Sequence, residues 1–373
     1  ALERLFITGV SPVTMDDVTS GFNIGTNITN DSWFNDLVGF SENELREMLE
    51  YYKEQGVLQE SIDEIVAMMK PNYDNYCFSE DTLEQCMFNS DMALYFLKSF
   101  VLHHKKPKEI VDPNIRTDFN KLAYLIKLDH GLGENFSVIK EIAEQGEIIT
   151  DIVTHFSALE MTDPSNFKSL LFYFGLLSIK GVDMVGRPIL HVPNLVVREQ
   201  LFNFLIQGYI KHDIFKIDMN KMSALFENMA FRGDWKPLFD FIANAVREQS
   251  RIREYIEGEA HIKGFLLAYL GMYRYYQLYP EYGLNKGFAD FFFKPSLSVP
   301  VLPPFTYLLE VKYAKAGASE KEIRALADEA REQLLRYSED ELVAEAKAKG
   351  ELKLITIVWR SWELALLEEV TLS

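Results

Sequence analysis

The sequence predicts a multidomain α/β protein. A mostly helical N-terminal and middle region precedes a C-terminal mixed sheet with the order αβββαβ. Apolar residues recur at helical spacing through most of residues 35–249, whereas short apolar runs separated by turn residues dominate residues 250–373. With 373 residues and 48% hydrophobic side chains, the chain is long enough for two or three domains. We place the boundaries at residues 1–34, 35–150, 151–249 and 250–373.

The composition excludes several classes of protein. No apolar run approaches the ~20 residues of a membrane-spanning helix, and no signal-peptide pattern is present. Cys77 and Cys86 are too few for a disulfide framework or a four-thiolate metal site. We therefore expect a cytoplasmic protein without membrane association, and a homo-oligomer is compatible with the sequence.

The charge is unevenly distributed along the chain. The formal net charge is −18, which argues against broad adhesion to nucleic acid. Residues 251–373 hold 16 basic and 19 acidic side chains, so most of the excess negative charge precedes them. Contact between the C-terminal region and DNA is therefore allowed by the charge.

Residues 1–34 contain one short apolar run, over residues 5–13, that ends in hydroxyl side chains. It is typical of a buried strand, which normally lies among other strands of a parallel sheet. One interpretation is a sheet edge without a nucleotide role, and the other is the last part of a nucleotide-binding domain. No G-x-x-x-x-G-K-[ST] phosphate loop occurs, so no ATP site is predicted in this chain.

The next region, residues 35–150, is predicted to be helical. Apolar faces repeat over residues 41–55, 62–69 and 91–102, and Ser41 with Glu44 forms a capping box at the first of them. Residues 72–78 form an aromatic, Asn-rich loop. A packed structural turn is the favoured interpretation of this loop, and a binding loop is the alternative.

Residues 151–249 predict a module with the element order of a winged helix. The expected elements are a helix over residues 165–174, strands over 175–179 and 188–193, and a helix from Asn194 onward. The candidate recognition helix carries a single basic residue, Lys168, so a protein–protein or intramolecular role is favoured over DNA reading. Two more helices with apolar stripes follow within residues 213–249, and residues 247–253 form a polar hinge.

The C-terminal region supplies the sheet. We expect helices over residues 259–273 and 319–337, and strands over 273–279, 288–293, 306–313, 354–358 and 363–370. Turn chemistry marks residues 281–287, and Ser319 with Glu322 forms a second capping box. The order of strand, helix and strand implies a crossover and therefore a mixed sheet.

Two of these apolar strands contain acidic side chains. Burial of a carboxylate is unfavourable unless a partner compensates its charge. Asp290 lies in the second strand; Glu310 and Lys312 lie in the third and share a face, because alternate strand residues point the same way. Asp290 and Glu310 can meet across one Mg²⁺ or Mn²⁺, with the carbonyl of Val311 as a further ligand. The alternative is an ordinary ion pair between Glu310 and Lys312, with Asp290 capping a turn.

Several blocks resemble a known family. The run Phe6-Ile7-Thr8-Gly9-Val10-Ser11-Pro12-Val13, followed by blocks at residues 19–24, 39–45, 72–78 and 112–118, resembles AAA-ATPase-like proteins. The resemblance implies that the chain starts at the last strand of the ATPase core. Thr8 would then lie near the position that senses the terminal phosphate, and the phosphate loop would precede this chain.

The C-terminal pattern resembles the PD-(D/E)xK nuclease superfamily, which implies a restriction-endonuclease-like fold and Mg²⁺-dependent hydrolysis of DNA. Asp290 and Glu310 match the superfamily's metal ligands, and Lys312 matches its lysine. Glu259 and Glu281 match additional acids, of which Glu259 is a candidate metal ligand. Gln333 and Tyr337 match two residues on the following helix. Phe288 stands where relatives usually show Arg. The alternative function is a catalytically weak or inactive nuclease-fold module for regulation or interaction.

Overall fold

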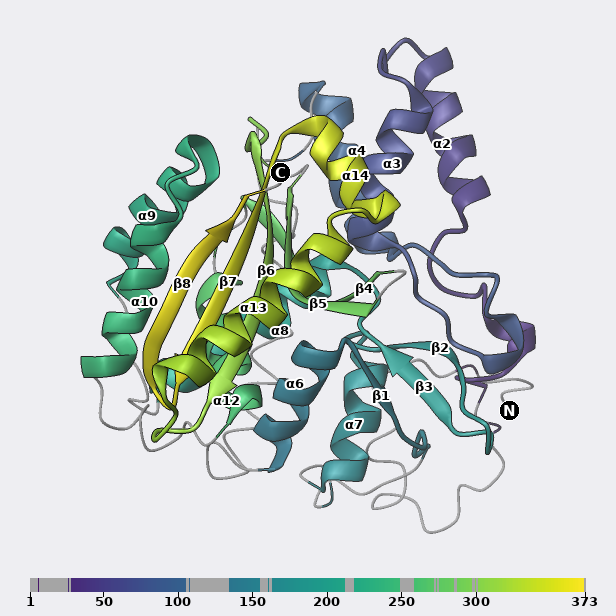
Figure 1. Ribbon diagram of the computed structural model, residues 1–373. Helices are drawn as coiled ribbons and strands as arrows, with labels where there is room; N and C mark the ends of the chain where they lie inside the picture. The colour runs from purple at the N-terminus through teal and green to yellow at the C-terminus, as the bar shows by residue number, and fades with distance from the viewer. Residues whose placement is uncertain are drawn as a thin grey trace. The chain divides into compact units, whose positions relative to one another are not determined.

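The computed structural model (Figure 1) describes residues 28–104, 134–154, 163–211, 218–248, 258–271, 275–284, 287–296 and 301–371, with single residues at 6, 26, 107, 160, 273 and 299. The chain divides into two compact units, Ala1–Gln200 and Leu201–Ser373. The strand expected over residues 5–13, apart from the exposed Phe6, lies outside the described residues. So do Thr8, the block at 112–118 and most of the hinge at 247–253.

The first unit is mainly helical. Its elements are η1 (Ser32–Phe34), α2 (Glu42–Glu54), α3 (Ile62–Tyr73), η2 (Glu80–Thr82), α4 (Ser90–His103), α6 (Glu134–Gln145), β1 (Glu147–Ile149), α7 (Pro164–Tyr173), β2 (Ser178–Val182), β3 (Pro188–His191) and the start of α8 (Leu195–Lys211). The predicted capping box is present, because Ser41 Oγ accepts the N–H of Glu44 and Glu44 Oε2 accepts the N–H of Ser41.

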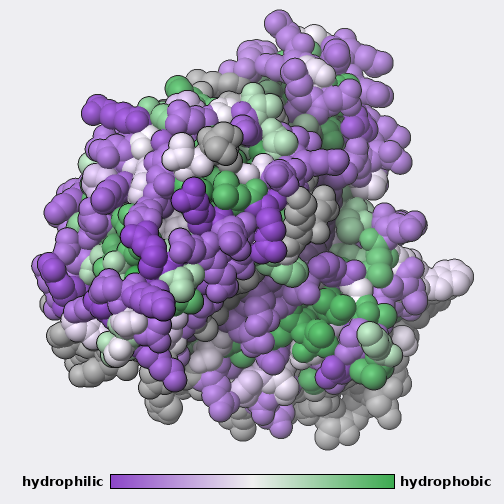
Figure 2. Space-filling model, viewed as in Figure 1, coloured by the Kyte–Doolittle hydropathy of each residue, from purple (hydrophilic) through white to green (hydrophobic). Residues whose placement is uncertain are grey.

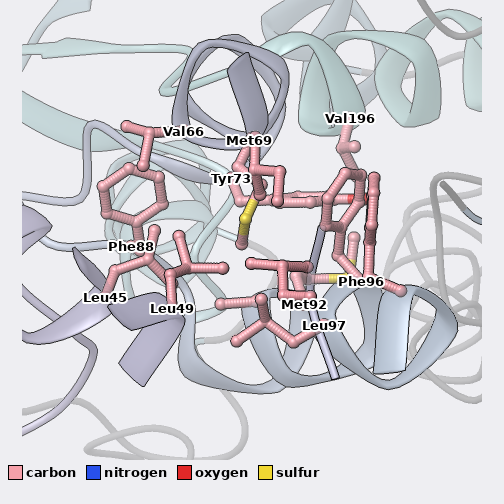
Figure 3. Packing of buried hydrophobic residues seen from close by; sticks show 14 residues of the cluster. Leu45, Leu49, Val66, Met69, Tyr73, Phe88, Met92, Phe96, Leu97 and Val196 are labelled. Atoms are coloured by element: carbon pink, nitrogen blue, oxygen red, sulfur yellow. The ribbon is translucent and has the colours of Figure 1, made fainter. Parts of the chain in front are cut away.

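A compact apolar core holds α2, α3 and α4 together (Figure 3). Leu49 from α2, Met69 from α3 and Met92 from α4 point toward one another within a cluster of buried side chains. Tyr73 and Phe96 add an edge-to-face ring contact with centroids 5.7 Å apart. Burial of each large side chain contributes about 1.5–3 kcal/mol, so this cluster explains why the helical pattern of the sequence is realised here.

The loop after α3 serves packing in the first unit. The side-chain amide of Asn75 donates to the carbonyl of Pro193 at 2.9 Å, and that of Asn194 donates to the carbonyl of Asp74 at 3.1 Å. The expected order of helix, hairpin and helix is observed as α7, β2, β3 and α8, and β1 extends the hairpin into a three-stranded sheet with the order β1-β3-β2. The role of this module as a winged helix stays a prediction.

The second unit is built on a five-stranded mixed sheet. Beyond the end of α8, its elements are α9 (Met219–Arg232), α10 (Lys236–Glu248), α12 (Glu259–Leu270), β4 (Tyr276–Leu284), β5 (Gly287–Pro295), β6 (Phe305–Ala314), α13 (Glu320–Tyr337), α14 (Glu341–Lys349), β7 (Glu351–Arg360) and β8 (Glu363–Val370). The strand order is β4-β5-β6-β7-β8, and only the β6–β7 pair is parallel. The predicted mixed sheet and its crossover through α13 are therefore observed.

Helices cover both faces of this sheet. On one face Leu308 of β6 packs in a cluster with Leu334 of α13, which crosses the strands in Figure 1. On the other, the hydroxyl of Tyr307 donates to the carbonyl of Met229 in α9 at 2.6 Å. Because neighbouring strand residues point to opposite faces, α13 and α9 lie on opposite sides of β6.

Two details of the second unit differ from the sequence prediction. The turn expected over residues 281–287 is shorter than predicted, because β4 continues to Leu284 and pairs it with Gly287 of β5. The strand continues through these residues because Tyr282 packs against Phe292, with ring centroids 5.0 Å apart. The short helix α14 was not predicted, although the buried Val343 and Ala346 attach it to the core.

The face of the molecule in Figure 2 is predominantly polar. Hydrophilic residues cover most of the face shown in Figure 2, and hydrophobic residues form smaller areas among them. Within the part of the chain that the structure describes, no helix is both long and apolar enough to cross a membrane.

Candidate functional site

The candidate site lies where β5 and β6 separate. Ladder pairing between these strands ends at Phe291 opposite Leu309, so the next positions in the same register are Asp290 and Glu310. Instead of a continued ladder, Asp290 Oδ2 accepts the backbone N–H of Val311 at 2.7 Å. The register thus places the two acids opposite each other across a fork between the strands.

Both acids are buried. The exposed fraction is 4% for Asp290 and 3% for Glu310. Glu310 Oε1 accepts a hydrogen bond from Lys312 at 3.2 Å, whereas Glu310 Oε2 has no hydrogen-bond partner among the described residues. A buried carboxylate oxygen without a partner is costly, and an ion at this position is one of its ordinary explanations.

The electrostatics of Glu310 indicate that negative charge is concentrated at the fork. Burial, followed by the negative charge of Asp290, raises the pKa of Glu310 to about 8, although Lys312 and Lys263 act in the opposite direction. At neutral pH this carboxyl therefore holds a proton in much of the population. A divalent cation bound at the fork would replace that proton and compensate both acids.

Lys312 lies between two carboxylates. Its ammonium Nζ is 3.2 Å from Glu310 Oε1 and 3.2 Å from Oε1 of Glu329, which comes from α13. Burial acts to lower the pKa of Lys312, but the charges of Glu310 and Glu329 outweigh burial and raise the pKa. Lys312 thus carries its positive charge at neutral pH, beside an acid whose pKa is raised.

The helix α13 presents a row of side chains toward the fork. Glu329, Gln333 and Tyr337 are spaced four residues apart and so share one face of the helix. Glu329 contacts Lys312 at one end of the row, and the Tyr337 hydroxyl lies beside Gly287 at the other. Gln333, between them, has a buried Oε1 without a hydrogen-bond partner among the described residues.

Gly287 makes this approach of Tyr337 possible. Its φ of +140° is rarely adopted by other residues, and a Cβ there would lie 2.9 Å from the Tyr337 hydroxyl oxygen. We expect Gly287→Ala to reduce the free energy of unfolding by about 1–3 kcal/mol. Chemical denaturation measures this change, and Gly317→Ala is the control, because no atom lies within 4 Å of a Cβ at Gly317. Equal stabilities of the two variants would contradict the expected strain.

The sequence interpretation missed two residues, Glu329 of α13 and Lys263 of α12. The Nζ atom of Lys263 is 2.5 Å from Asp290 Oδ1 and 3.0 Å from Glu259 Oε1. Glu259 therefore reaches Asp290 through the ammonium of Lys263. The four-residue spacing of Glu259 and Lys263 was the available signal, but that spacing is also typical of a solvent-exposed ion pair.

The other predicted residues occupy separate positions. Val311 is buried in β6 directly after Glu310, Phe288 is 64% exposed at the start of β5, and Glu281 lies in β4 with a side chain outside the described residues. In the described part of the chain, no three His, Cys, Asp or Glu side chains form a group that could hold a metal. Two carboxylates remain, which suits Mg²⁺, since this ion keeps several waters. Glu259 as a metal ligand stays a prediction.

Comparison with known proteins agrees with this architecture in the second unit. Residues 257–369 match the family described as the PD-(D/E)XK nuclease superfamily. No curated protein matches the chain. The family match does not extend to residues 1–256, so their resemblance to AAA-ATPase-like proteins stays a prediction. The segment from α12 to β8, which contains Asp290, Glu310 and Lys312, is a PD-(D/E)XK nuclease superfamily domain.

Proposed function

We propose that this domain is a nuclease that hydrolyses the phosphodiester bonds of DNA with Mg²⁺ or Mn²⁺. The observation that carries the proposal is the buried pair Asp290 and Glu310, opposed at a strand fork, with Glu310 Oε2 unpartnered among the described residues. Lys312 supplies the adjacent positive charge. An ATPase-like regulatory region, a cytoplasmic location and a homo-oligomer are further proposals that rest on the sequence alone.

The residues at the fork fit a divalent cation. Carboxylate oxygens are the ligands that Mg²⁺ and Mn²⁺ prefer, and Asp290 and Glu310 would hold the ion together with the carbonyl of Val311. When bound, the ion would polarise the scissile phosphate and lower the pKa of a coordinated water. The raised pKa of Glu310 supports this assignment, because a bound cation would offset its two causes, which are burial and the negative charge of Asp290.

The neighbouring side chains have complementary tasks. The Lys312 ammonium, held by Glu310 and Glu329, would stabilise the negative charge that develops on the phosphate oxygens. The free amide oxygen of Gln333 would accept a hydrogen bond from the attacking water and so orient it. Glu310 must release its proton before it can bind the ion, so activity should rise with pH toward the pKa of about 8.

A cleavage assay tests this proposal. Single- and double-stranded DNA are incubated with the whole chain in Mg²⁺, in Mn²⁺ or in EDTA, and metal binding is measured in parallel by calorimetry. We expect metal-dependent cleavage, and a loss of about 10²-fold in kcat for Lys312→Met. Lys315→Met, which changes an exposed lysine three residues further on, is the control. Absence of both cleavage and metal binding would refute the proposal.

Phe288 favours a second candidate function. An exposed phenyl ring replaces the cation that relatives usually show two residues before the acid, which weakens the attraction for a phosphate backbone there. On this alternative the domain keeps the nuclease fold but serves regulation or interaction. Metal binding without cleavage in the same assay would select this alternative.

A further inference from the structure

Both carboxylate oxygens of Asp290 already have partners within the protein. Oδ2 accepts the backbone N–H of Val311 at 2.7 Å, and Oδ1 lies 2.5 Å from the ammonium of Lys263. A divalent cation ligated by Asp290 must therefore approach an oxygen that is in use. A carboxylate oxygen can accept a neutral N–H and still ligate a metal, but two cations on Oδ1 repel each other strongly in a buried site, so a metal that binds there must change the contact with Lys263.

The two partners differ in their freedom to leave. The N–H of Val311 belongs to a buried strand residue that also pairs with β7, so it cannot withdraw without disruption of the sheet. The Lys263 side chain has a flexible four-carbon stem, is 20% exposed, and already contacts Glu259, whose side chain is 43% exposed. Lys263 can therefore move away from Asp290 toward Glu259 and solvent, whereas the N–H of Val311 is held in place by the sheet.

We infer that Lys263 is an internal competitor for the metal: it holds Asp290 while the fork is empty of metal and leaves when a divalent cation binds. This inference rests on the metal site proposed above. It explains how the buried charges at the fork are compensated when no metal is bound. It also means that the apparent metal affinity is reduced by the fraction of molecules in which Lys263 occupies Asp290.

The chain offers a matched control in Lys353 of the same unit. Its ammonium also joins two carboxylates, at 3.1 Å from Glu351 Oε1 and 3.0 Å from Glu369 Oε1. Its side chain is similarly shielded, but it contacts neither acid of the fork in any described interaction. Replacement of either lysine by Met removes one positive charge from the domain, and only Lys263→Met removes the competitor.

Calorimetric titration with Mn²⁺, without DNA, measures the competition. We expect Lys263→Met to lower the Kd by about tenfold, as for a competitor that occupies about 90% of the molecules. Lys353→Met should stay within about twofold of wild type, and Lys263→Arg should not bind more tightly than wild type. Equal or weaker binding by Lys263→Met, with clear binding by wild type, would overturn this inference alone. Absence of binding in wild type and in Lys263→Met would refute the metal site as well.

Chemical reactivity reports the movement itself. Wild-type protein is acetylated with an amine-reactive ester with and without Mn²⁺, and the rate at each lysine is read by mass spectrometry. We expect Mn²⁺ to increase the rate at Lys263 severalfold, because its ammonium leaves Asp290, and to leave the rate at Lys353 unchanged. If Mn²⁺ binds but Lys263 remains as protected as before, the lysine does not leave and the inference is wrong.

Discussion

Asp290→Asn is expected to lower the cleavage rate by about 10³-fold or more while the protein keeps its fold. The amide oxygen of Asn can still accept the N–H of Val311, which Asp290 holds at 2.7 Å. The negative charge that binds the metal is lost, and a neutral amide is a poor ligand for Mg²⁺. Cleavage rates at saturating Mn²⁺ measure the loss of activity, and chemical denaturation of the metal-free protein measures separately whether the fold is kept.

Asp290→Ala separates the structural role of this residue from its role in metal binding. It should be as inactive as Asp290→Asn, but it also leaves the buried N–H of Val311 without its acceptor. We expect a further loss of about 1–3 kcal/mol in the free energy of unfolding for the alanine variant. Cleavage by Asp290→Asn within tenfold of wild type would show that Asp290 does not bind the catalytic metal.

Glu310→Gln is expected to act on activity and on stability with opposite signs. Burial and Asp290 raise the pKa of Glu310 to about 8, from an ordinary value of 4.5. A carboxyl with a raised pKa in the folded state stabilises the fold fully below pH 4.5, and this contribution is lost as the pH rises through 8. The variant cannot ionise, so at pH 9 it should be more stable than metal-free wild type by about 1–3 kcal/mol.

Denaturation curves in EDTA at pH 5 and pH 9 test this expectation. The two proteins should be similar at pH 5, where Glu310 of wild type is protonated, and should diverge at pH 9. Addition of Mn²⁺ at pH 8 should reverse the order, because only wild type gains stability from the ion. A variant that is less stable than wild type at pH 9 would show that ionisation of Glu310 does not destabilise the fold.

The central residues of the site could be found from the sequence because strand chemistry is local. Glu310 and Lys312 are two residues apart in an apolar run, so they share a side wherever that strand lies, and the structure joins them at 3.2 Å. The capping box at Ser319 similarly fixes the start of α13, where the structure has it. The position of Asp290 opposite Glu310 is a non-local feature, which follows from the sequence only on the assumption that their two strands are neighbours.

Lys263 could not be found in the same way, because its partner is distant in the chain. The ion pair that the sequence shows, with Glu259, is not the only one that Lys263 makes, and Asp290 lies 27 residues further along. The helix α14 was missed for a related reason. Val343 and Ala346 are too few to form a pattern, and their burial depends on the cluster around Leu334.

The lysines on either side of the fork link its buried acids to the solvent. Lys263 joins Asp290 to Glu259, and Lys312 joins Glu310 to Glu329, whose side chains are 43% and 58% exposed. Acidic and basic side chains thus alternate from the fork to the surface, through α12 in one case and α13 in the other. Salt in the buffer screens exposed charges far more than buried ones, so it acts on these outer glutamates first. When salt weakens the contact between a lysine and its outer glutamate, the lysine interacts more strongly with the inner acid. The ionic strength of the medium therefore changes the interactions of buried acids inside the domain.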